Sequence, residues 1–339
     1  MDLLTSIIYV VVTFIIAGFV ALWLPGIEKK SEARVQQRIG PQLTSPGIYT
    51  TLKFFYKKAL KPSAVMPRVY NALPIVTLIV VAALFLILMP PVMVAWGPFA
   101  SIVAVVGLLK VEEVLYLFMS SFSQSLMSKT MPFPDQAKGG KHRDAKQSFL
   151  ETISANRSLR LISFGSLPFY IALFIPVIMA RSIDLVEIVR FQQVNGAFLF
   201  TLPGIIGSIV FFIGFLIILN SNPFAYMEGH SDVIQGPIME YMSKSRAIYT
   251  MAHASLIFVG SCLYSTLFLG MPPFFALTPV LNISIIIPII CSIIITMAIA
   301  VTSAFAPLFT NREFYPTVIA TGMIAVVGVI TAVLTTVLL

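Results

Sequence analysis

The chain has 339 residues, of which 58% are hydrophobic and only 11% are charged, and its mean hydropathy is +0.94. Ordinary soluble domains carry about 25% charged residues. A soluble globule of this length has too little interior to hide so much apolar surface. Composition therefore excludes soluble fold classes and disorder, and it predicts a membrane protein.

Eight stretches are long and apolar enough to cross a bilayer, which takes about 20 residues of helix. They are continuously apolar rather than alternating, so helices are expected and a β-barrel is not. The predicted spans are residues 6–24, 73–94, 99–119, 161–180, 202–219, 247–269, 280–306 and 316–339. The sequence thus predicts an all-α polytopic membrane protein in which residues 1–339 form one integral membrane domain.

Basic residues are concentrated in the loops that follow the first, third, fifth and seventh spans, which hold 19 of the 22 Lys and Arg. Because positive loops stay in the cytoplasm, both termini are expected outside. These loops are also the long ones, which favours a soluble partner docking on the cytoplasmic face. A basic domain interleaved with aromatics is lacking, so nucleic acid is not an expected partner.

Residues 47–61 are predicted to form a basic amphipathic helix that lies on anionic lipid and ends before Pro62. A solvated helical connector is the alternative. The apolar face would consist of Ile48, Leu52, Phe55 and Ala59, opposite Lys53, Lys57 and Lys61.

The third predicted span contains Lys110, Glu112 and Glu113. Charges within an apolar span are costly and usually mark an ion or proton route. Lys110 and Glu113 are three residues apart and so can pair on one helical face. The alternative is that the span is shifted and the cluster lies at the membrane interface.

The segment 223–241 between the fifth and sixth spans is rich in titratable residues, namely Glu228, His230, Asp232 and Glu240. A helical turn would place Glu228 and Asp232 on one face, and clustered carboxylates raise one another's pKa. Such a loop can carry or gate protons, although an ordinary solvated acidic loop is the alternative.

His253 lies early in the sixth span and is the only titratable group deep in it. Histidine titrates near neutral pH, which suits proton transfer, but a lone histidine also serves as a structural residue. The two cysteines, Cys262 and Cys291, are isolated and cannot hold an iron–sulfur cluster or a structural zinc alone. No metal site or cofactor is therefore expected in this chain.

Two basic runs flank the membrane, and their arginines either dock a partner or simply snorkel to the interface. One follows the first span and includes Arg34, Arg38, Gly40 and Pro41. The other opens the fourth span with Arg157 and Arg160 on one helical face.

In this order, the segments resemble the eight-helix membrane subunit that forms the quinone-channel base of respiratory complex I, with its relatives in membrane-bound energy-converting hydrogenases. That family carries a charged run leading to Arg-x-Gly-Pro after its first helix, then an amphipathic helix, then a proline that opens the second helix. The matching residues here are Glu28-Lys29-Lys30, Arg38-Ile39-Gly40-Pro41 and Pro74. After the fifth helix, the family's Pro-Phe…Glu-Tyr stretch is matched at Pro223, Phe224, Glu228, Asp232, Gly236, Glu240 and Tyr241.

Several carboxylates of the family are replaced in this chain. Ala225 stands in place of an Asp, and Gly165, His230 and His253 stand in place of Glu. The family's acidic path is therefore incomplete, and the sequence looks closer to the ferredoxin-oxidising, hydrogenase-related branch, which has no quinone.

The resemblance implies a non-catalytic subunit of an ion-translocating oxidoreductase complex in a prokaryotic cytoplasmic membrane. Its expected partners are peripheral iron–sulfur and catalytic-like subunits on the cytoplasmic side, antiporter-like and small membrane subunits, and lipid. Iron–sulfur clusters would lie in the partners. The site residues would couple electron transfer from ferredoxin to H⁺ or Na⁺ movement, and the arginine runs would dock the peripheral arm. The alternatives are a quinone-binding complex I subunit, a stand-alone secondary transporter and an intramembrane transferase.

Overall fold

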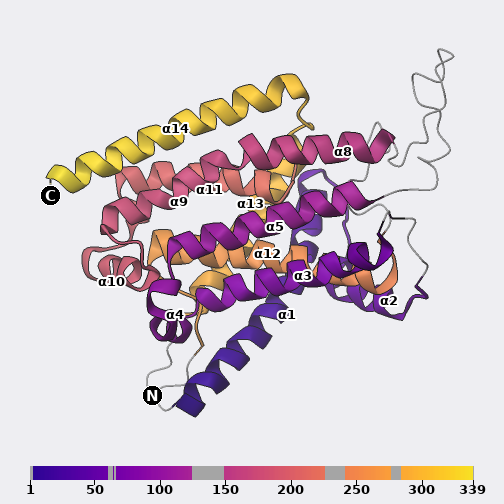
Figure 1. Ribbon diagram of the computed structural model, residues 1–339, viewed down its shortest axis with the longest axis horizontal. Coiled ribbons are helices and arrows are strands. Elements are labelled where there is room, and N and C mark those ends of the chain that lie inside the picture. The colour runs from indigo at the N-terminus through magenta and orange to yellow at the C-terminus, as the bar shows by residue number, and fades with distance from the viewer. Residues whose placement is uncertain are drawn as a thin grey trace.

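The computed structural model describes residues 3–59, 64, 66–123, 149–225, 241–275 and 284–338. Within these residues the chain is built from helices and contains no strand beyond one isolated bridge between Ser101 and Asp184. The long helices run roughly side by side (Figure 1). This confirms the predicted all-α membrane fold.

The long helices follow the predicted spans in chain order. They are α1 (Leu3–Val35), α3 (Pro67–Ile87), α5 (Ile102–Phe122), α8 (Phe149–Arg160) with α9 (Leu167–Ala180), α11 (Leu202–Ile218), α12 (Ser243–Leu269), α13 (Ile286–Phe305) and α14 (Asn311–Leu338). Six of the helical stretches are long and apolar enough to cross a membrane. Of the other two, α11 has only 17 residues and α5 carries three charges. The arrangement is consistent with eight spans.

The second span differs from its prediction of residues 73–94. Helix α3 begins at Pro67 and ends at Ile87, and a separate short helix, α4, covers Pro90–Trp96. Met89 between them is extended, because the residue before a proline is pushed out of the helical region. Pro74, expected to open the helix, instead lies inside it, and Pro67 takes the first position.

The amphipathic helix is shorter than the predicted 47–61. A π-helical turn (Ser45–Tyr49) leads into α2 (Thr50–Tyr56), and Lys57 is already extended. The Lys57 carbonyl accepts a hydrogen bond of 2.5 Å from the Ser243 hydroxyl at the start of α12, a tertiary contact that overrides local helix preference. Leu52 and Phe55 are exposed, as expected for a face that meets lipid.

Two glycines bring the segment before α2 into backbone contact with α1. A Cβ added at Gly26 would lie 1.7 Å from the Leu43 carbonyl oxygen, and one added at Gly47 would lie 1.7 Å from the Leu22 carbonyl oxygen. Only glycine allows two backbones to approach this closely. These two contacts fold the segment back along the end of α1.

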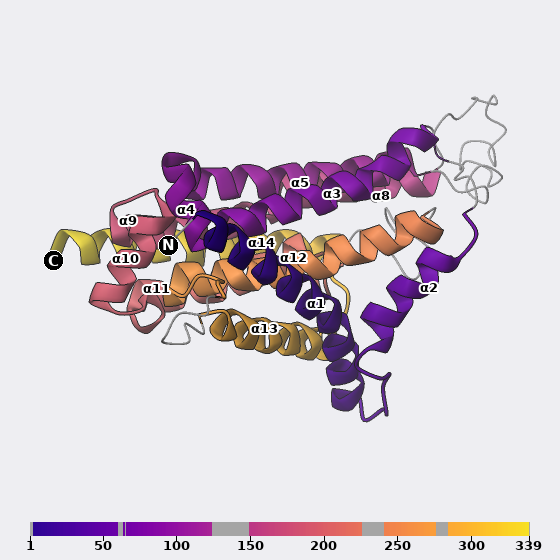
Figure 2. The same cartoon turned by 90° about the horizontal axis from the view of Figure 1, so that it is seen from below.

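Helix α12 forms the centre of the bundle, packed against α1, α3 and α13. Figure 2 shows α3 and α5 on one side of it and α13 on the other. Aromatic side chains fill the interior, and small residues let the helices approach. A Cβ at Gly260 of α12, for example, would lie 2.2 Å from the Phe215 ring. The remaining outer surface is apolar, particularly along α14.

Candidate functional site

Lys110 and Glu113 of α5 form a hydrogen-bonded network with residues at the start of α9. The Lys110 ammonium lies 2.7 Å from Glu113 Oε2, and it also donates to Ser166 Oγ at 2.7 Å and to the Ile162 carbonyl at 3.1 Å. The Tyr170 hydroxyl donates to Glu113 Oε1 at 2.9 Å. All three Lys110 protons therefore have an acceptor, which lowers the cost of burying the pair.

The junction between α8 and α9 has the shape that this network needs. Residues Leu161–Gly165 form a π-helical turn, which is a rare form found often at functional sites. Within it, the Ile162 carbonyl accepts from both Lys110 and the Ser166 hydroxyl. The π turn thus supplies a backbone acceptor to the middle of α5.

Gly165, where the family has a carboxylate, is buried in this turn. A Cβ at this position would lie 3.0 Å from Ile217 Cγ2 and 3.1 Å from Phe314 Cζ. The space that a carboxylate would need is occupied by apolar side chains.

Glu112 and Glu113 are only 7% and 4% exposed. Their helix, α5, extends from Ile102 to Phe122, three residues beyond the predicted span, and this places the acids near its middle rather than at its end. Among the described residues, the Glu112 carboxyl has no side-chain partner like those that Lys110 and Tyr170 give Glu113. The two neighbouring carboxylates therefore have different surroundings, one bound by a cation and hydroxyls and the other not.

His253 lines a second polar region, a cavity of about 320 Å³ beside α12. The cavity lies between segments that are far apart in sequence: the end of α1, α5, the chain after α11, α12 and α13. Its polar lining consists of Glu28, Lys29, Tyr116, Asn220, Ser221, Asn222, Arg246, Tyr249, Thr250, His253 and Ser303. Ala225, where the family has an Asp, also lines it, so the replaced positions 225 and 253 face one space.

The cavity combines an ion pair with an amide oxygen that lacks a partner among the described residues. Lys29 lies 2.8 Å from Glu32 and 3.6 Å from Glu28. Asn220 adopts a left-handed backbone conformation (φ +50°), and its buried Oδ1 has no hydrogen-bond partner among the described residues. A polar cavity of this size has room for about ten water molecules.

A group of aromatic rings borders the cavity. The rings of Tyr249 and His253 are parallel with centroids 6.4 Å apart, and Tyr241 stacks between Tyr249 and Tyr70. The Tyr241 hydroxyl donates to the Tyr70 carbonyl at 2.9 Å. Burial raises the pKa of Tyr241, so that this hydroxyl stays protonated as a donor.

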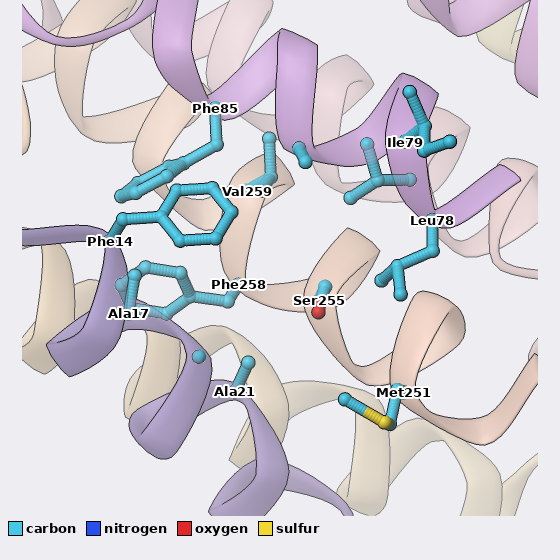
Figure 3. Close-up of a pocket in the computed structure, with 13 residues that line it drawn as sticks. Phe14, Ala17, Ala21, Leu78, Ile79, Phe85, Met251, Ser255, Phe258 and Val259 are labelled. Atoms are coloured by element: carbon cyan, nitrogen blue, oxygen red, sulfur yellow. The ribbon is translucent and has the colours of Figure 1, made fainter. Parts of the chain in front are cut away.

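An apolar pocket of about 310 Å³ lies on the opposite face of α12, between α1 and α3 (Figure 3). Phe14, Phe85 and Phe258 close one end of it, and Met251 lies at the other. Among the described residues that line it, Ser255 has the only polar side chain. The pocket can take an apolar chain but offers little to a polar group.

The structure brings together some of the predicted site residues and not others. Lys110 and Glu113 are joined directly, whereas His253 lies in the separate cavity. Glu228, His230, Asp232 and Glu240 lie outside the described residues. Of the predicted docking residues, Arg34, Arg38, Gly40, Pro41 and Arg160 are exposed and Arg157 is partly buried.

Sequence reasoning missed Ser166 and Tyr170, although their four-residue spacing on α9 marks one polar stripe in an apolar helix. It also missed Tyr116, which lies one turn after Glu112, and Tyr249, which lies one turn before His253. The sequence signal that could have found these residues is a polar side chain one helical turn from another polar or charged one. The Glu28-Lys29 pair belongs to a family motif, but no sequence pattern places it beside His253.

Comparison with known proteins gives consistent matches. The sequence profile of the NADH dehydrogenase family matches residues 7–130 and 144–337. An uncharacterised protein of Methanocaldococcus jannaschii is 36% identical over 94% of this chain and 95% of its own length. The H-type subunit of the NADH-quinone oxidoreductase of Carboxydothermus hydrogenoformans is 28% identical over 74% of this chain and 66% of its own length.

The fold is also similar to a chain in the structure of the membrane-bound sulfane sulfur reductase, an archaeal respiratory membrane complex. The TM-score is 0.78 at 23% identity, over 96% of this chain and 99% of that one. The profile match covers most of the chain, and the helix order agrees with it. The chain therefore belongs to the NADH dehydrogenase family, together with the H-type subunits of NADH-quinone oxidoreductases.

Proposed function

We propose that this chain is the membrane-anchoring and coupling subunit of a complex I-like respiratory complex. It would dock an iron–sulfur peripheral arm on the cytoplasmic face and link electron transfer from ferredoxin to H⁺ or Na⁺ movement by antiporter-like subunits. The observation that carries this proposal is the ion pair between the buried Glu113 and the partly exposed Lys110, held by hydroxyl and carbonyl groups next to a second helix. Intramembrane charges of this kind are costly and are kept for ion or proton movement.

The polar cavity beside α12 supports the same role. Its lining includes residues just after α11 and in the first turns of α12, and residues 226–240 lie between those two stretches in the sequence. The acidic residues predicted to respond to electron transfer lie in that connection. Glu228→Gln and Asp232→Asn are therefore expected to uncouple ion movement from electron transfer more than they lower expression.

Exposed arginines support the proposed docking of partner subunits. Arg34, Arg38 and Arg160 are exposed near helix ends and are available to acidic groups of a docked subunit. Purification in mild detergent tests this directly. Iron–sulfur and antiporter-like subunits are expected to copurify, whereas a chain that runs alone or as a homo-oligomer would indicate a stand-alone transporter.

A quinone-binding role is the second candidate, because the apolar pocket in Figure 3 would fit an isoprenoid chain. The purified complex, reconstituted with reduced ferredoxin, distinguishes the two. Turnover without added quinone is expected with an acceptor such as protons or a sulfur species. Strict dependence on quinone would replace the first proposal with the second.

A further inference from the structure

Two tyrosine hydroxyls connect α5 to α12 at the edge of the polar cavity. The Tyr249 hydroxyl donates to the Tyr116 hydroxyl at 3.1 Å, and the two rings stack with centroids 6.2 Å apart. Both tyrosines line the cavity. Stacked rings need no hydroxyl contact, so the hydrogen bond is a separate feature of this pair.

On the α5 side, Tyr116 lies one helical turn after Glu112. Side chains on a helix point toward its N-terminus and cover the preceding turn. Tyr116 therefore shares a helical face with Glu112, which is only 7% exposed. Glu113, the next residue, belongs to the network with Lys110 and Tyr170.

On the α12 side, Tyr249 lies between two groups that can carry positive charge. The His253 ring is parallel to its own, and the Arg246 guanidinium carbon is 6.0 Å from its centroid. Glu28 and Lys29 of α1 face the same space. The Tyr249–Tyr116 hydrogen bond thus joins the α12 lining of the cavity to α5.

We infer that the Tyr249–Tyr116 hydroxyl pair is the step by which a proton passes between the polar cavity and the buried carboxyl of Glu112, an inference that rests on the coupling function proposed above. A hydronium ion in the cavity gives a proton to the Tyr249 oxygen. Tyr249 passes its own proton to Tyr116, and Tyr116 passes its own to the Glu112 carboxylate. Only O–H bonds break and form. Both phenols end protonated, and one proton has moved.

The nearby tyrosines provide matched controls. Tyr264 lies on the same helix, and its hydroxyl is paired with Ser208 Oγ at 2.7 Å, away from the cavity lining. Tyr264→Phe therefore removes one hydroxyl and one hydrogen bond without touching the proposed step. Tyr249→Phe and Tyr116→Phe remove the hydroxyls of the pair and keep both rings.

The test uses the intact complex in sealed vesicles, with reduced ferredoxin as donor and the acceptor that supports wild-type turnover. Protons moved per electron are read from a pH-sensitive dye. Tyr249→Phe and Tyr116→Phe are each expected to lower this ratio about 100-fold, the low end of what a positioned proton-transfer group contributes. The double variant should be no worse than either single variant, because both break one step. Tyr264→Phe should match the wild type.

Two further measurements distinguish proton transfer by the tyrosine hydroxyls from a role in ring packing. The melting temperature of the solubilised complex should be the same for all three single variants. Replacing Tyr249 with 3-fluorotyrosine, which keeps a hydroxyl, should retain coupling. If Tyr249→Phe and Tyr116→Phe couple like Tyr264→Phe while Glu112→Gln does not couple, the hydroxyl step is wrong and the proposed function stands. If Glu112→Gln also couples normally, Glu112 does not receive the proton and the inferred step is wrong, whereas the proposed function fails only if the wild-type complex moves no ions per electron.

Discussion

The α5 network and the α12 cavity are both polar regions among membrane-spanning helices, but they differ in how fully their groups are bonded. In the network, Lys110 uses all three protons and Glu113 accepts from an ammonium and a phenol. In the cavity, the Asn220 Oδ1 has no partner among the described residues and about 320 Å³ stays open. A saturated network fixes geometry, whereas an open polar cavity admits water and can change its charge.

Lys110→Met should have the largest effect on stability, because it leaves the Glu113 carboxyl buried without its cation. Breaking a fully buried pair from one side costs about 3–5 kcal/mol, and the loss here should be smaller because the Lys110 side chain is partly exposed. Thermal unfolding of the complex in detergent measures the loss. Lys110→Met combined with Glu113→Leu should recover most of it, since no charge remains. Equal instability of the double variant would contradict the comparison.

Glu113→Gln keeps most of the shape of the network and removes its negative charge. Ion movement per electron should fall by about 100-fold, the low end of what a positioned proton-transfer group contributes, while electron transfer continues. Vesicles assayed for both rates at once measure this. Normal ion movement would reduce the network to a structural element.

His253→Leu addresses the cavity, where an open space should tolerate the change. Leucine fills a similar volume without titrating, and the expected change in stability is about 1 kcal/mol or less. Coupling should fall several-fold if His253 passes protons. Full coupling with unchanged stability would favour a purely structural histidine.

The smallest effect is expected at the membrane surface. Leu52→Thr on the exposed face of α2 removes apolar area that meets lipid and leaves both polar regions intact. The melting temperature of the complex in lipid bilayers should fall slightly, with unchanged coupling. A large loss of coupling would show that α2 contacts more than lipid.

Much of the fold follows from the sequence because apolar length alone places membrane helices. The break at Met89 was harder to place, because the apolar run continues across Pro90 and Pro91. The early end of α2 depends on Ser243, almost 190 residues away, and no local pattern could indicate it. Boundaries were thus missed where a proline or a distant contact overrides hydropathy.

Part of the candidate site could likewise be predicted from the sequence and part could not. The Lys110–Glu113 pair follows from helical spacing, but its partner Tyr170 comes from another helix. The cavity that contains His253 is assembled from five segments, and its shape follows only from their packing. Composition marks which residues are costly to bury, and tertiary structure decides what surrounds them.

The two glycine contacts between α1 and the segment before α2 have a mechanical consequence. Because the backbones touch at Gly26 and Gly47, no flexible side chains lie between α1 and this segment at these two points. A displacement of the segment before α2 is therefore expected to move the C-terminal part of α1 with it. Those turns carry Glu28 and Lys29, so a load applied outside the bilayer would move one wall of the cavity.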